Sequence, residues 1–240
     1  ISILGYFASR KIPTTSATDP NLNINWNIFS EIKKSITYSK KDQKVFLCII
    51  GISWFWFYAS AITLQIPAYT LNIINGNELI TTLLLATFAI GIGIGSLACE
   101  KLSNNQVEIG IIPIGAAGLT IFVLDLYFAT PSNNLEQITS ISIFLDQPNN
   151  WRIIFDLIMI GASGGIFSVP LYANIQKKAD KKYLSRIIAA NNILNAVFMV
   201  SASLLAIITL TSGLSILEFF LLYLKVHLYQ LASMKLPHFE

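Results

Sequence analysis

The sequence predicts an all-α membrane protein with six transmembrane helices. Of its 240 residues, 54% are hydrophobic and 12% are charged, whereas a soluble domain usually carries about 25% charged residues. The stretches without any charge are long and cover residues 45–77, 79–99, 157–176 and 187–217. A helix needs about 20 apolar residues to cross the hydrocarbon layer, so each of these stretches is long enough to span a membrane.

Six spans account for the apolar runs along the chain. We place them at residues 45–67, 79–99, 107–128, 153–175, 187–209 and 213–232. The sixth span is the least apolar, because Glu218, Lys225 and His227 interrupt it.

Lysine and arginine predict the direction of the spans. Seven of them precede residue 45, and five lie between residues 177 and 186. With six spans, all of the 16 lysines and arginines except Arg152 fall on one side of the membrane. Short loops rich in these residues stay in the cytoplasm. We therefore expect a multi-pass protein in which both ends of the six-helix unit are cytoplasmic.

This topology divides the chain into four segments. Residues 1–8 look like the last turns of a preceding transmembrane helix, so we expect the chain to be a piece of a longer protein. The other three segments are a cytoplasmic linker over 9–44, the six-helix bundle over 45–232 and a cytoplasmic tail over 233–240.

Isoleucine recurs every four residues in the linker, at Ile24, Ile28, Ile32 and Ile36. This period predicts an amphipathic helix. Such a helix either lies on the inner leaflet of the membrane or packs against the end of the bundle.

Glycine and proline recur in the first helix of each half of the bundle, if spans one to three and four to six form two triplets of opposite direction. The residues are Gly51 and Pro67 in the first span and Gly161, Gly164, Gly165 and Pro170 in the fourth. Interrupted helices at corresponding places in inverted repeats point to the substrate path of a transporter. Close packing of helices explains the same glycines equally well.

The stretch "AIGIGIGSLACEKL" (89–102) carries glycine at every second position. Its spacing is that of a dinucleotide-binding loop, but such a loop needs a strand before it and a helix after it. Here a charge-free helix surrounds the glycines. We therefore expect Gly91 and Gly95 to form a ridge of small residues for helix packing.

The end of this stretch resembles the cytoplasmic-turn signature of the major facilitator superfamily. Gly95, Leu97 and Ala98 match it and Lys101 belongs to the same turn, whereas Cys99 and Glu100 replace an Asp and an Arg. Five longer stretches resemble, in order, the second half of lysophospholipid transporters: "NINWNIF" (23–29), "VFLCIIGISWFWFYAS" (45–60), "IGIGIGSLACEKLS" (90–103), "GGIFSVPLYANIQ" (164–176) and "SRIIAANNILNAVFMVSA" (185–202). They are most similar to the transporter portion that some bacteria fuse to an acyltransferase and an acyl-carrier-protein synthetase.

The resemblance implies one half of a major facilitator fold, with six helices in a 3+3 inverted repeat. It also implies inward movement of lysophospholipids, such as lysophosphatidylethanolamine, across the bacterial inner membrane. The implied partners are membrane lipids, the missing N-terminal six-helix half on the same or a separate chain, and the acyltransferase and synthetase. Without that half we expect no transport. Two alternatives stay open: a facilitator for another small molecule, and a non-transporting membrane anchor for the acyltransferase and synthetase.

Polar and aromatic side chains inside the spans are the candidates for the substrate path. They are Trp54, Trp56 and Gln65 in the first span, Tyr172, Asn174 and Gln176 in the fourth, and Asn191, Asn192 and Asn195 in the fifth. The polar residues of the fourth and fifth spans lie at a similar depth, so we expect hydrogen bonds between these two helices. Such bonds serve either helix packing or the binding of a lipid headgroup.

Carboxylates within a bilayer are candidates for ion binding. Glu108, Asp125 and Asp156 lie near the ends of predicted spans, where we expect water to reach them. Glu218 and Lys225 lie well inside a span, seven residues apart on one helix face.

Patterns for enzyme chemistry are missing from the sequence. An acyltransferase of the related fusions needs His and Asp with four residues between them, but Ala232 stands at that distance from His227. We expect no catalytic residues, no metal site and no cofactor. We also expect no nucleic-acid partner, because the basic residues lie beside apolar spans and membrane topology accounts for them.

Overall fold

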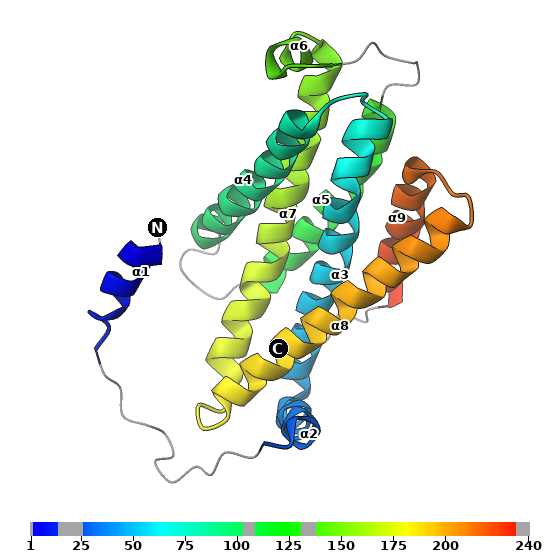
Figure 1. The fold of residues 1–240 in the computed structure, drawn as a ribbon. Coiled ribbons are helices and arrows are strands. Elements are labelled where there is room, and N and C mark those ends of the chain that lie inside the picture. Colours follow the sequence, from blue (N-terminus) through cyan, green and yellow to red (C-terminus); the bar gives the residue numbers. More distant parts are fainter. Residues whose placement is uncertain (1, 14–25, 103–108, 131–137, 234–240) are drawn as a thin grey trace.

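The computed structural model describes residues 2–13, 26–102, 109–130 and 138–233 (Figure 1). Every regular element within these ranges is a helix, so the predicted all-helical fold is confirmed. The predicted tail beyond residue 233, linker residues 14–25 with Ile24, and Glu108 lie outside the described residues.

Five helices are long and apolar enough to cross a membrane, and they cover the first five predicted spans. They are α3 (Gln43–Asn72), α4 (Glu78–Leu102), α5 (Ile112–Ala129) with the 3₁₀ turn η1 (Ile109–Ile111) before it, α7 (Pro148–Lys178) and α8 (Leu184–Thr211). A further helix, α9 (Ile216–Ser233), forms where the sixth span was predicted but is not among them, because its sequence is interrupted by charged and polar side chains. The remaining helices are α1 (Ser2–Ser9), α2 (Ile28–Ser39) and α6 (Ile141–Leu145).

Local sequence explains where the helices begin. Asp42 caps α3, because its Oδ1 accepts hydrogen bonds from two backbone N–H groups at 2.8 and 3.2 Å. Pro148 occupies the first turn of α7, where its missing N–H costs nothing. In α9, Glu218 Oε2 accepts from the backbone N–H of Ser215 at 2.8 Å and forms a capping box with it. The prediction that Glu218 lies well inside a span is therefore wrong, since it lies in the first turn of α9.

The two central helices are α3 and α7. The most apolar part of each is 78% and 72% buried, against 22% in α8. Helices α4 and α5 both pack on α7, whereas α8 packs on α3 and α9 packs on both α5 and α3. The second and third helix of each predicted triplet thus pack on the first helix of the other triplet. Figure 1 shows α8 crossing α3 obliquely, with α2 at one end of the bundle and α6 at the other, which we call the α2 end and the α6 end.

Glycines set the distance between α4 and α7. A Cβ atom added at Gly91, Gly95, Gly161 or Gly165 would lie 2.0 to 2.7 Å from a backbone atom of the facing helix. We call these four residues the glycine contact. By comparison, a Cβ atom at Gly93 would have nothing within 4 Å. The two backbones therefore touch at the glycine contact, and any side chain there has to push the helices apart.

Close contacts at glycines also occur on the other sides of α7. A Cβ atom at Gly164 would lie 2.5 Å from Cε2 of Phe55 on α3. On α5, a Cβ atom at Gly115 would lie 2.6 Å from the backbone nitrogen of Phe167. Gly115 was not singled out in the sequence, where a lone glycine in an apolar run carries no signal of its own.

Candidate functional site

Four side chains connect α3, α7 and α8 by hydrogen bonds, and we call them the polar cluster. Ser53 Oγ donates to Asn195 Oδ1 at 2.9 Å, and Asn195 Nδ2 donates to the hydroxyl of Tyr172 at 3.5 Å. Trp56 Nε1 donates to the same hydroxyl at 3.0 Å. Ser53 lies about 15 Å along α3 from Gln43, at ~1.5 Å per residue, so the cluster lies at membrane depth.

The polar cluster reaches from the core of the bundle towards its surface. Ser53 and Asn195 are buried, at 0% and 7% exposure, whereas Trp56 and Tyr172 are half-buried. Buried polar groups need partners, and in a membrane each bond between helices contributes about 0.6 kcal/mol and at most ~2 kcal/mol. Bonds of this strength hold the helices in register and can still be exchanged for bonds to a polar ligand.

One turn of α8 closer to the α2 end, two further carboxamides lie side by side. Asn191 is 2% exposed, and its Nδ2 donates to Oδ1 of the exposed Asn192 at 3.3 Å. Oδ1 of Asn191 is buried and receives no hydrogen bond from the described residues. This pair adds an unused acceptor, and an exposed carboxamide next to it, to the same helix as Asn195.

Trp54 belongs to a different contact from Trp56. Its Nε1 donates to Nδ1 of His227 on α9 at 3.0 Å. His227 is fully buried, and its Nε2 lies 3.4 Å from the carbonyl oxygen of Ala116, so both ring nitrogens have partners. The structure therefore places Trp54 between α3 and α9 rather than in the polar cluster, and His227 was not recognised as its partner in the sequence.

The other candidates on α3 and α7 also lie apart from the polar cluster. Asn174 is buried and donates from Nδ2 to Sγ of Cys48 on α3 at 3.0 Å. Gln176 is exposed, and Gln65 is buried further along α3 towards the α6 end. The predicted hydrogen bonding between α7 and α8 is confirmed by the bond from Asn195 to Tyr172, whereas Asn174 bonds to α3 and Gln176 is exposed.

The prolines and the signature residues occupy separate surroundings. Pro67 is exposed on α3, whereas Pro170 is buried in α7, two residues before Tyr172. Leu97 and Lys101 are exposed and Ala98 is half-buried, all in the last turns of α4. Residues 103–108, which follow them, lie outside the described part of the chain.

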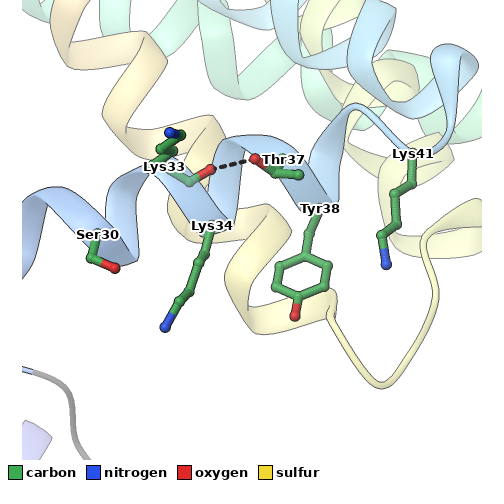
Figure 2. A pocket seen from close by; sticks show the side chains of 6 residues that line it. All are labelled: Ser30, Lys33, Lys34, Thr37, Tyr38 and Lys41. Atoms are coloured by element: carbon green, nitrogen blue, oxygen red, sulfur yellow. Dashed lines mark hydrogen bonds between the residues drawn. The ribbon is translucent and has the colours of Figure 1, made fainter.

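Helix α2 packs on the end of the bundle and leaves one face free. Nη1 of Arg186 on α8 lies 2.7 Å from Oε2 of Glu31 on α2. The rings of Tyr38 and Tyr183 stack with centroids 4.2 Å apart. The free side carries the exposed Phe29 and a shallow pocket, which Figure 2 shows lined by Ser30, Lys33, Lys34, Thr37, Tyr38 and Lys41. This basic end of the bundle suits contact with anionic headgroups.

A group of charged side chains lies at the α6 end. Arg152 Nε donates to Asp125 Oδ2 at 3.0 Å, and Arg152 Nη2 also pairs with Asp125 Oδ1. Asp156, one turn beyond Arg152 on α7, is fully buried. The prediction that water reaches Asp156 is therefore wrong, because the packing of α7 turns this side chain into the bundle.

Comparisons of the chain with protein-family models, with curated proteins and with solved structures find no match. Within the described residues, no group of three His, Cys, Asp or Glu side chains gathers as a metal site. Function is therefore inferred from the geometry of the polar cluster and of the helices around it.

Proposed function

We propose that this chain forms the second half of a transporter of the major facilitator type, which moves lysophospholipids such as lysophosphatidylethanolamine inward across the bacterial inner membrane. The chain works together with a first half of six helices, on the same or a separate polypeptide. The polar cluster is the observation that carries this proposal.

The polar cluster suits a headgroup in three respects. It offers hydrogen-bonding groups at membrane depth, where a headgroup crossing the bilayer has lost its water. Trp56 and Tyr172 are half-buried, so the cluster can be reached from one side. The aromatic faces of the same two side chains add apolar surface next to the polar atoms.

Helix α8 supplies an apolar surface for an acyl chain or for a partner half. Beyond Asn195 towards the α6 end, most of its exposed side chains are apolar, among them Val200 at 59%, Leu204 at 55% and Ile207 at 59% exposure. A lysophospholipid has one acyl chain and one headgroup, so it needs an apolar surface that continues from a polar site. The order of polar and apolar side chains along α8 provides both.

The pairing of the helices also supports a transporter half. The second and third helices of each triplet make contacts with the first helix of the other triplet, an arrangement compatible with two triplets related by an inverted repeat. Together with the stretches that resemble lysophospholipid transporters, this arrangement favours the transport proposal over a membrane anchor. An anchor does not need the helices of one triplet to pack on the first helix of the other.

Uptake of a labelled lysophosphatidylethanolamine into proteoliposomes tests the proposal. The chain is reconstituted alone and together with a six-helix first half from a lysophospholipid transporter. We expect uptake from the pair and none from the chain alone, because both halves of the transporter are needed to form the headgroup site. Uptake by the chain alone, or none by a pair that is folded and associated, contradicts the proposal; the second result leaves the anchor.

Substitution of Asn195 then separates binding from packing. Asn195→Leu removes both bonds of this side chain, and we expect uptake to fall at least tenfold while the protein stays folded. Ser201→Ala is the matched control, because Ser201 is exposed on the same helix and bonds to its own backbone, at Val197 O. Normal uptake by Asn195→Leu with a lowered melting temperature makes the polar cluster a packing device and removes it from the substrate path.

A further inference from the structure

The buried carboxyl group of Asp156 lacks the partners that a charged group needs. Asp156 is 0% exposed, and neither of its oxygens receives a hydrogen bond from the described residues. It lies about 12 Å along α7 from Pro148, at ~1.5 Å per residue, in a helix that is long and apolar enough to span a membrane. An isolated carboxylate in such surroundings is costly, so the group either binds a cation or carries a proton.

The groups that face Asp156 come from three helices. The carboxyl group of Asp125 on α5 lies close enough to act electrostatically on that of Asp156, and two neighbouring carboxyl groups resist being ionised together. Arg152 on α7 is engaged by both oxygens of Asp125. The hydroxyl of Tyr69 on α3 is close enough for the charge of Asp156 to act on it. It also forms a hydrogen bond with Thr130 Oγ1 at 3.0 Å.

The charges of these groups do not cancel. Arg152 neutralises one carboxylate, that of Asp125, because its guanidinium group pairs with both oxygens of that side chain. If Asp156 is also ionised, one negative charge remains in a fully buried position. Among the described residues, the other acidic side chains at this end are Glu78, Asp146 and Glu218, and all three are exposed to water.

We propose that Asp125 and Asp156 bind one proton between them, and that this pair is the proton-binding site of the protein. The proton comes from water at the α6 end, which is the outer side in the predicted topology. When it binds, an O–H bond forms on a carboxyl oxygen and the group of three side chains becomes neutral. When it leaves, Asp156 turns anionic and has to find water or Arg152, which requires a local movement of α7 against α5.

That this proton drives transport rests on the proposed function. That a proton is bound to the two carboxyl groups does not rest on it. The site is far from the polar cluster, at the opposite end of α7, so proton binding can be measured on the chain alone. Loss of the proton site leaves the transport proposal standing, and absence of transport leaves the proton site standing.

Infrared difference spectroscopy of the purified full chain in lipid nanodiscs tests the proposal. A protonated carboxyl group in an apolar site gives a C=O stretching band that shifts on exchange into heavy water. We expect this band at neutral pH and its loss at high pH. Asp156→Asn should abolish it, since asparagine has the size of the protonated acid and keeps the fold. The matched control is Asp146→Asn, which removes an exposed acid and should leave the band unchanged.

Asp125→Asn gives a second, independent result. It frees Arg152 to neutralise Asp156, so the proton is no longer needed and the band should disappear in a folded protein. The proposal is overturned if the native chain shows no such band, if the band survives in Asp156→Asn, or if it survives in folded Asp125→Asn. It is also overturned if sodium ions at neutral pH remove the band, because the site then binds a metal cation in place of the proton.

Discussion

The contact of α4 with α7 and the contact of α8 with α3 occupy corresponding places in the two triplets, but they are held in different ways. At the first, the glycine contact brings backbone atoms of the two helices together. At the second, the polar cluster connects the helices through side-chain hydrogen bonds, from Ser53 to Asn195 and on to Tyr172.

The difference shows how one bundle can combine a rigid and an adjustable contact. Helices in lipid gain little from the hydrophobic effect when they associate. Their association therefore depends on close packing and on hydrogen bonds between polar side chains. Backbone contact fixes one distance, because there are no side chains to rearrange. Hydrogen bonds between side chains tolerate small shifts and can pass to a ligand. We infer that α8 is the helix that moves when substrate binds, whereas α4 and α7 stay together.

The largest effect is expected at the glycine contact. Gly95→Ala places a Cβ atom 2.0 Å from the carbonyl oxygen of Ala162 and has to separate the helices, at a cost of about 1 to 3 kcal/mol. Gly93→Ala is the matched control two residues away, where the space is open, and should be neutral or stabilising by up to ~1 kcal/mol. Thermal unfolding in detergent compares the two variants. Equal melting temperatures would mean that the glycine contact is not a fixed backbone contact.

A smaller effect is expected at the polar cluster. The variants Ser53→Ala and Asn195→Ala, with the double variant, form a cycle that isolates the bond at 2.9 Å. We expect a coupling free energy of about 0.6 to 2 kcal/mol, the range of hydrogen bonds between transmembrane helices. Reversible unfolding in mixed micelles measures it. A coupling near zero would show that the two side chains do not interact in the membrane.

The smallest effect is expected at the half-buried edge of the polar cluster. Trp56→Phe removes one donor to the Tyr172 hydroxyl and should cost about 0.6 kcal/mol. Tyr172→Phe removes the acceptor, so adding Trp56→Phe to it should cost nothing further. The same unfolding assay measures all three variants, and an additive loss in the double variant would argue against the bond.

The apolar runs predicted five of the long helices well, because length and absence of charge are the features that make a transmembrane helix. Four of the predicted spans are shorter than the helices; residues 45–67 became Gln43–Asn72, for example, and 153–175 became Pro148–Lys178. The extra turns are richer in polar residues than the spans, and local caps such as Asp42 extend the helix beyond the apolar part. The sixth span was harder, since Glu218 looked like a charge inside it and is a helix cap.

The candidate site was predicted only in part, for a different reason. Asn195 and Tyr172 were found because polar side chains stand out in apolar helices. Ser53 carries no such signal in an aromatic run, although it makes the shortest bond of the polar cluster. For Asp156, the distance from the helix end could be predicted, but not the direction in which its side chain points, because that depends on how α5 and α7 pack.

The proposals depend on the predicted direction of the helices, which would put α2 and its lysines in the cytoplasm and Asp156 near the outer side. Single cysteines at two exposed positions test it most directly, in a chain whose buried native cysteines are replaced by Cys48→Ser and Cys99→Ala. We predict that Lys181→Cys, between α7 and α8, reacts with an impermeant reagent only from the cytoplasmic side, and Ser212→Cys, between α8 and α9, only from outside. A reporter fused after Glu240 should be cytoplasmic if α9 crosses. Labelling of Lys181→Cys from outside would contradict the account, and an external reporter would reduce the crossings to five.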